Sequence, residues 1–203
     1  DIETFLVQLG RFRTHVDAHF SGPVTWEMPH AYLSPFLDGA DEEGLRRAAH
    51  ILLFVLGAEA SERAATPELS LSWGIPRHLA HRRAVGPARV AEGSTYRDYE
   101  MAAKRFLDEI LGVYLQSHST SLPLPRFVAG AGFFAEDGYK EILVRLAETA
   151  MAHGFFEIEF DRGGDWDAVY GISSGRAVAQ AVNLNLARMA FRSGDETALL
   201  DNL

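Results

Sequence analysis

The sequence predicts an α/β fold in which short strands alternate with helices around a parallel sheet. Two observations lead to this prediction. Segments such as ELSLSW and FFEIEF alternate polar and apolar residues, as strands do, and segments with apolar residues at helical spacing separate them. Helices of this length connect parallel strands as crossovers, so the sheet is expected to be parallel and either open or closed into a barrel. The chain has 203 residues, of which 47% are hydrophobic, and we expect one domain over 1–203, beginning with a helix and connector over 1–24.

The first part of the chain is predicted to hold two helices joined by an irregular connector. Apolar residues recur at helical spacing over 2–20. The segment 21–36 contains three prolines, which favours a connector. A second helix is predicted over 42–57, because acidic residues fill its first turn and Gly57 provides a stop.

The remaining elements alternate in the same way. A strand over 68–73 is followed by a basic, irregular loop over 77–93 and by a long helix over 96–116 that Thr95 caps. We then expect a strand over 125–132, a helix over 137–153, and strands over 155–160 and 177–186. One face of the long helix is predicted to be buried, and it consists of Tyr99, Ala103, Phe106, Ile110 and Tyr114.

Three of the predicted strands carry polar residues on one face. These are Ser70 and Ser72, Glu157 and Glu159, and Asn183 and Asn185. Strands of a parallel sheet covered by helices on both faces are usually apolar throughout, and these are not. Two explanations remain open: a barrel covered by helices outside with a polar interior, or an antiparallel sheet with one solvated face.

Charge and composition exclude several functions. The net charge is −9, which disfavours a nucleic-acid surface but allows a local site for a small anion. The absence of cysteine removes disulfides, thiolate metal sites and thiyl chemistry from these residues. No apolar run is long enough to span a membrane, so we expect no membrane partner, and we predict a cytoplasmic protein.

The turn GISSGR is a candidate binding site for an anion. Backbone N–H groups, the hydroxyls of Ser173 and Ser174, and Gly175 with Arg176 could hold a phosphate. The alternative is an ordinary surface turn, since short Ser/Gly turns are common.

Three other groups of residues have a functional and a simpler interpretation. Glu157 and Glu159 could act as an acid/base pair, or they could be solvated carboxylates. His15 and His19 have a metal-binding spacing, but the sequence favours a solvated helix face and no metal site. A basic loop could steer an anionic substrate or simply be a charged surface, and it contains Arg77, His78, His81, Arg82, Arg83 and Arg89.

Several segments, in order, resemble anaerobic (class III) ribonucleotide reductases. VTWEMPHAYLSPF and the helix after it are similar to the "YLAPF" element, and TPELSLSWGIPRHL resembles the next strand and its exit. STYRDYEMAAKRFLDEILGVYLQSHSTSLPLPRF resembles the following helix and strand entry, and AVNLNLARMAF the "INLPRIGY" strand and turn. The resemblance covers roughly 25–191.

This resemblance implies a glycyl radical enzyme barrel of two parallel five-stranded halves, of which these residues would supply about half. Family members reduce ribonucleoside triphosphates with a radical that passes from a glycine to a cysteine. Asn185 and Arg188 match the family, whereas Ser70 and Ser72 replace its Asn and Thr. The interval DRGGDWDAVYGISSG, where the family has its reactive cysteine, contains none.

The sequence therefore favours a ribonucleotide-reductase-like domain without radical chemistry. Its polar lumen would bind a nucleotide or other small anionic ligand, or the domain would serve as a scaffold, and no cofactor is identified. The alternatives are a non-radical enzyme that uses Glu157 or Glu159, and a fragment of an active anaerobic reductase. Because a half-barrel leaves sheet edges unpaired, we also expect a homo-oligomer or a partner subunit.

Overall fold

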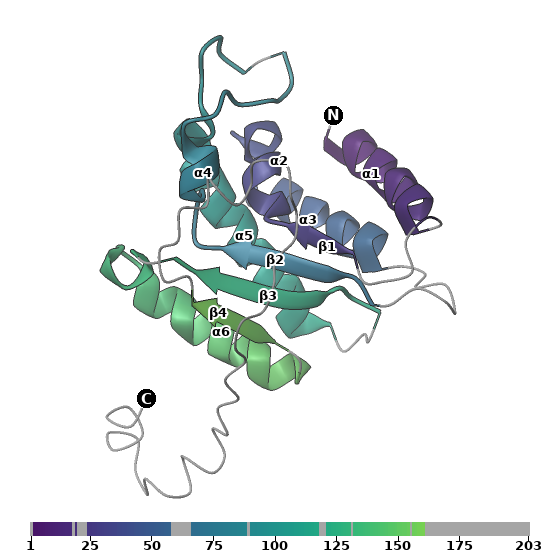
Figure 1. Cartoon of the computed structure of the whole chain (residues 1–203), viewed down its shortest axis with the longest axis vertical. Helices are drawn as coiled ribbons and strands as arrows, with labels where there is room; N and C mark the ends of the chain where they lie inside the picture. The colour runs from purple at the N-terminus through teal and green to yellow at the C-terminus, as the bar shows by residue number, and fades with distance from the viewer. Residues whose placement is uncertain are drawn as a thin grey trace, which may run out of the picture. The chain divides into compact units, whose positions relative to one another are not determined.

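Four short strands form a parallel sheet in the computed structural model. They are β1 (Thr25–Glu27), β2 (Glu68–Ser72), β3 (Leu124–Ala129) and β4 (Glu157–Phe160), and they lie side by side in chain order (Figure 1). The structure describes residues 2–17, 19, 24–57, 66–88, 90–117, 121–130, 132–154 and 156–160. These residues belong to a unit that spans Asp1–Trp166. The parallel sheet confirms the α/β prediction and excludes the antiparallel alternative for these strands.

Helices connect the strands. The α-helices are α1 (Ile2–Asp17), α2 (Pro29–Leu37), α3 (Glu42–Gly57), α4 (Arg77–Ala80), α5 (Glu100–Gln116) and α6 (Tyr139–His153). Two short 3₁₀ helices, η1 (Tyr96–Tyr99) and η2 (Phe133–Ala135), precede α5 and α6. The predicted helices over 2–20, 42–57, 96–116 and 137–153 are confirmed, with the first ending three residues earlier than expected.

Two predictions about irregular segments were wrong. The connector predicted over 21–36 contains β1 and α2. Pro29 is tolerated because it occupies the first turn of α2, where its missing N–H needs no partner. The strand β1 was missed because three residues are too few to show alternation. The basic loop is also partly ordered, since Arg77–Ala80 forms α4 and Arg83 makes an antiparallel bridge with Thr95.

One face of the sheet packs against the helices and forms the core. Leu69, Leu71 and Phe127 point to this face and are fully buried. Figure 1 shows α3, α5 and α6 behind the sheet. The face of α5 predicted from sequence supplies much of this layer, with Phe106 and Ile110 fully buried. Burying an aromatic or large aliphatic side chain contributes about 1.5–3 kcal/mol to the free energy of folding. The many buried side chains on this face therefore supply most of the hydrophobic stabilisation.

Local contacts explain where α3 begins and ends. The side-chain Oδ1 of Asp41 accepts a hydrogen bond of 2.8 Å from the backbone N–H of Gly44, which satisfies a free donor of the first turn. At the other end, a β-carbon on Gly57 would collide with the backbone carbonyl of Ser121. Gly57 is therefore required by the close approach of the segment that leads into β3.

The opposite face of the sheet is polar, and we call it the polar face. The strand register places on it Thr25, Glu27, Glu68, Ser70, Ser72, Arg126, Glu157 and Glu159. The predicted polar sides of 68–73 and 155–160 thus lie on one surface. The third predicted strand, with Asn183 and Asn185, lies outside the described residues, and closure into a barrel stays a prediction.

Candidate functional site

Arg126 lies at the centre of the polar face and pairs with three carboxylates. Its Nη2 is 2.8 Å from Oε2 of Glu68, its Nε is 3.1 Å from Oε2 of Glu157, and its Nη1 is 3.9 Å from Oε2 of Glu159. Thr25 donates a hydrogen bond of 2.9 Å to the same Glu68 oxygen. We call these four charged residues the Arg126 cluster. It brings together both glutamates that the sequence singled out as an acid/base pair.

The pairing with Arg126 limits what these glutamates can do. A guanidinium beside a carboxylate occupies acceptor positions on its oxygens with hydrogen bonds. Glu157 is also largely exposed, with 64% of its side chain accessible. The geometry therefore supports ion-pair partners better than an isolated acid/base pair, and their catalytic role stays a hypothesis.

Ser72 is buried at the carboxyl end of β2 and contacts His30. The Ser72 Oγ lies 3.4 Å from His30 Nε2, 3.3 Å from the carbonyl oxygen of Gly74 and 3.6 Å from Met28 Sδ. Met28 has a φ of +47°, a left-handed conformation that is uncommon for a residue with a β-carbon. This sharp bend directly after β1 turns the chain into α2 and so places His30 beside Ser72.

His30 is a fully buried imidazole with one nitrogen unsatisfied. Burial lowers the pKa of His30 to about 4, although backbone groups of Gly74 and Ser72 oppose this shift. Its Nδ1 has no hydrogen-bond partner among the described residues. The side chain is therefore neutral at physiological pH and retains one unused donor or acceptor, depending on its tautomer.

Ser70 is fully buried in the middle of the polar face. Its register partners are Glu27 on β1 and Arg126 on β3. The Ser70 Oγ also has no hydrogen-bond partner among the described residues. An unsatisfied buried hydroxyl costs about 1–3 kcal/mol, which makes such groups candidates for contact with water or a ligand.

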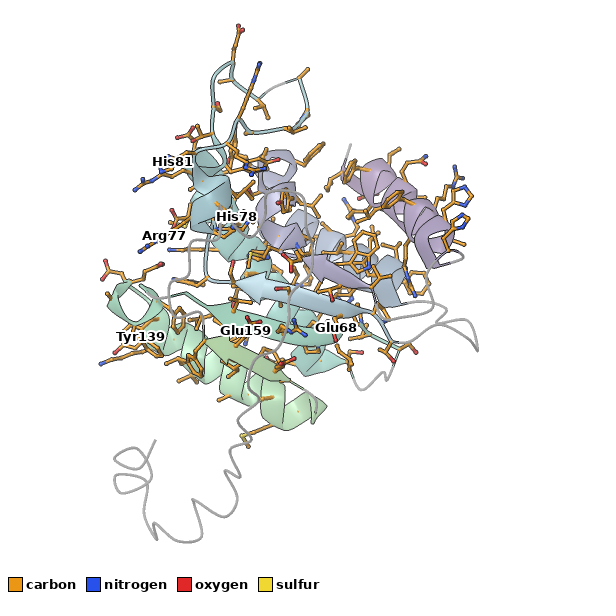
Figure 2. The ribbon with its side chains drawn as sticks, viewed as in Figure 1. Glu68, Arg77, His78, His81, Tyr139 and Glu159 are labelled. Atoms are coloured by element: carbon orange, nitrogen blue, oxygen red, sulfur yellow. The ribbon has the colours of Figure 1, made fainter. Side chains whose placement is uncertain are left out.

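Basic residues lie near the carboxyl ends of the strands. Figure 2 shows Arg77, His78 and His81 on α4 and just after it, on the side to which β2 points, with Glu68 toward the opposite end. Arg77 is exposed, and it forms no ion pair within the described parts of the chain. Its Nη2 lies 3.8 Å from the position that a β-carbon on Gly132 would take, beside the glycine-rich exit of β3.

The rest of the basic loop forms a separate hollow. Residues between 83 and 92, including Arg83 and Glu92, line an open pocket of about 520 Å³. All of its lining comes from this one loop, which does not reach the Arg126 cluster.

Several predicted site residues cannot be placed. Ser173, Ser174, Gly175, Arg176, Asn183 and Asn185 lie outside the described residues, as do Arg89 and Arg188. His15 and His19 are both exposed, and α1 ends at Asp17, so the two do not share a helix. Within the described ranges, no group of His, Cys, Asp or Glu is arranged to hold a metal ion.

Sequence reasoning missed three residues of this site. His30 was hidden in the segment predicted as a connector, and Arg126 and Glu68 were treated as ordinary strand residues. Arg126 could have been found, because a charged residue flanked by Pro125 and Phe127 in a short strand must point away from the core. No pattern in the sequence indicates that His30 folds back over β2.

Comparison with known proteins identifies the fold. No family model and no curated protein matches the sequence. The structure resembles that of the anaerobic ribonucleotide reductase from Thermotoga maritima, solved with glycerol in its active site, with a TM-score of 0.60 and 13% identity over 99% of this chain. A second anaerobic ribonucleotide reductase gives a TM-score of 0.61 and 15% identity, also over 99% of this chain.

These similarities define the class of the fold. The chain has an α/β fold similar to that of the matched part of these two reductases. It spans 36% and 35% of the two solved chains, about a third of each. Among the described residues, no helix has the length and apolar character needed to cross a membrane.

Proposed function

We propose that this chain forms one wall of a ribonucleotide-reductase-like barrel and binds a nucleotide or other small anionic ligand along its polar face. The observation that carries the proposal is the polar face itself, where Ser70 and Ser72 are buried on the side of β2 opposite to Leu69 and Leu71. In parallel α/β sheets, ligands bind at the carboxyl ends of the strands. Ser72, His30 and the glycine-rich exit of β3 lie at that end.

The charge distribution orients the ligand. The carboxylates of the Arg126 cluster would repel a phosphate, whereas Arg77 is exposed and unpaired within the described residues. An anionic group is therefore expected beside Arg77, with the rest of the ligand directed toward Ser72. The predicted turn with Ser173, Ser174, Gly175 and Arg176 remains a further candidate for the same anion.

The domain supplies binding without radical chemistry of its own. A thiyl radical needs a cysteine, and these 203 residues contain none. If the assembled protein reduces a nucleotide, its thiol comes from outside these residues. A fragment of an active reductase would obtain that thiol from the rest of its protein, whereas a scaffold would bind partners and need no ligand.

Thermal unfolding with nucleoside triphosphates tests the proposal. A ligand at a hundredfold excess over its Kd stabilises the folded state by about 2.7 kcal/mol, which raises the melting temperature by several degrees. Arg77→Ala is expected to reduce this shift. Arg47→Ala is the matched control, because Arg47 pairs with Glu3 on the α1–α3 surface. A melting temperature of the native protein that no triphosphate changes would overturn the proposal.

A non-radical enzyme that uses Glu157 and Glu159 is the second candidate, favoured by their position on the same face. Replacing both residues with Gln separates the two proposals. Loss of a detected activity with retained triphosphate binding would support the enzyme, and an unchanged activity would exclude these glutamates.

Assembly is a third element of the proposal. Ile158 and Phe160 on β4 are exposed, and Phe160 stacks on the exposed Phe134 at 6.2 Å. A strand with exposed apolar side chains at the edge of the described sheet could pair with the same strand of a second copy of the chain. Light scattering tests this, and a strictly monomeric species would contradict it.

A further inference from the structure

The second half of the basic loop folds into an ordered arm, residues 82–97, which we call the basic arm. Arg83 and Thr95 form an antiparallel bridge, and the backbone N–H of Tyr96 donates a hydrogen bond of 3.1 Å to the carbonyl oxygen of Arg82. Figure 1 shows this part of the chain beyond α4, away from the four strands. The two ends of the arm are therefore paired with each other, and the arm reaches outward from the sheet and its helices.

Contacts at the base of the arm hold it in place. Tyr96 is buried, and its hydroxyl oxygen accepts a hydrogen bond of 3.4 Å from the backbone N–H of Val85. Directly after the arm, the Asp98 side chain accepts hydrogen bonds of 2.8 and 3.2 Å from the backbone N–H and the hydroxyl of Thr95. The carboxylate that follows Arg97 in the sequence is thus already engaged in a helix cap.

Positive charge is concentrated on the basic arm. Four of its sixteen residues are arginines and one is an acid, Glu92, so the arm carries +3 in a chain whose net charge is −9. Arg82, Arg83 and Arg97 are exposed, and none of the three forms an ion pair within the described parts of the chain. A guanidinium presents its N–H donors in a planar fork that matches a carboxylate. The arm therefore offers donors for carboxylates that no described residue provides.

Apolar residues lie among these arginines. Val85, Pro87 and Val90 line the open hollow of about 520 Å³ on the arm, and Val85 is 67% exposed. Arg83 and Glu92 also line this hollow. An apolar centre with a polar rim is the usual arrangement of a contact between proteins. The arm thus combines an apolar position with positive charge around it.

We propose that the basic arm docks an acidic segment of a partner protein, in which carboxylates flank an apolar side chain. The carboxylates would pair with Arg82, Arg83 and Arg97, and the apolar side chain would cover Val85 at the hollow. A nucleic acid fits less well, because its phosphate backbone continues beyond the arm along an otherwise acidic protein. A free phosphate would leave the apolar hollow uncovered. Arg77, beside which the anionic ligand is expected, is not part of the arm, so this inference does not rest on that site.

Fluorescence anisotropy of a labelled peptide tests this surface on the full chain. The probe contains four glutamates around a central leucine. Two further peptides carry glutamine in place of the glutamates or serine in place of the leucine. We expect saturable binding of the probe that is lost at about 0.5 M sodium chloride, and no binding of the glutamine peptide. The serine peptide should bind about tenfold more weakly, because it lacks the apolar contact.

Paired substitutions locate the binding. The double variant Arg82→Glu/Arg83→Glu is expected to weaken binding of the probe by about tenfold or more. The matched control is Arg11→Glu/Lys140→Glu, which changes the net charge equally through two exposed residues on α1 and α6. Its binding should change by less than about threefold, because salt screens charges beyond a Debye length. Val85→Ser should remove the preference for leucine over serine and retain the dependence on glutamate.

All of the substituted side chains are exposed, so the variants are expected to fold, which circular dichroism checks. If the arm double variant does not fold, Arg83→Glu alone decides. No saturable binding of the probe, equal binding of the glutamine peptide, or equal losses in the arm and control variants would overturn the proposal. Tighter binding of a labelled oligothymidylate would overturn it in favour of a nucleic acid. Self-association that the probe competes away would overturn it in favour of a second copy of the chain. Arg77 is intact in every variant, so the triphosphate experiment succeeds or fails separately.

Discussion

The same strands form both faces of the sheet, but one face builds the apolar core and the other carries polar side chains. On β2, Leu69 and Leu71 point to the helices and are fully buried among apolar side chains. Ser70 and Ser72 point to the polar face and are also buried, but the Ser70 Oγ has no hydrogen-bond partner within the described parts of the chain. Burial alone therefore does not distinguish a structural from a functional position. An unsatisfied buried polar atom such as the Ser70 Oγ singles out a position for testing, because it has a cost and brings no stability.

The largest expected effect lies on the apolar face. Phe127→Ala would remove a fully buried ring that packs against Phe133 at 5.5 Å. Such a cavity costs about 3–5 kcal/mol of unfolding free energy. Urea unfolding measures it, with Phe134→Ala as the control, because Phe134 is 53% exposed. Equal losses in the two variants would show that Phe127 is not part of the core.

Protonation of His30 is expected to have the next largest effect on the free energy of unfolding. Because burial lowers the pKa of His30 from 6.5 to about 4, the folded state favours the neutral imidazole. This contribution to stability is complete above pH 6.5 and is lost as the pH falls from 6.5 toward 4. The loss amounts to about 3 kcal/mol.

Urea unfolding between pH 7.5 and 4.5 measures this loss. His30→Leu should remove this part of the pH dependence, whereas His15→Leu should retain it, because His15 is exposed. The same slope in all three proteins would contradict the assignment to His30.

On the polar face, Arg126→Ala is expected to cost about 1–2 kcal/mol, between the values for exposed and buried ion pairs. The Arg126 side chain is 18% exposed, and its loss leaves three carboxylates facing one another. Added salt screens this repulsion, so the difference from the native protein should shrink at 1 M sodium chloride. A cost that salt does not change would point to lost packing of the arginine stem.

Glu157→Gln should have the smallest effect, below about 0.5 kcal/mol, because 64% of the Glu157 side chain is exposed. Thermal unfolding of this variant beside Arg126→Ala gives the comparison. A loss of stability as large as that of Arg126→Ala would mean that the Arg126–Glu157 ion pair accounts for the stabilisation by the whole cluster.

The sequence predicted the apolar face far better than the polar one. The spacing of Ala103, Phe106 and Ile110 indicated the buried side of α5, because core burial follows the helical period directly. The alternation in 68–73 and 155–160 likewise predicted which residues leave the core. Which side chains these residues contact depends on the register between strands that are distant in the chain, as the pairing of Arg126 with Glu68 and Glu157 shows.

The placement of His30 was beyond sequence reasoning for a different reason. It depends on a left-handed backbone at Met28, a residue type that rarely adopts that conformation, and on prolines that suggested an irregular segment. Asp41 illustrates the opposite case, since a cap acts over three residues and is visible in the sequence.

The order of the strands also bears on how the chain folds as it is made. Because β1, β2, β3 and β4 pair in chain order, each described strand adds to a neighbour that the ribosome has already released. Synthesis proceeds at about 5–20 residues per second, which is slow compared with the closure of a helix or a short loop. The sheet can thus grow one strand–helix unit at a time, and the most recently added strand is the one whose edge awaits the next segment.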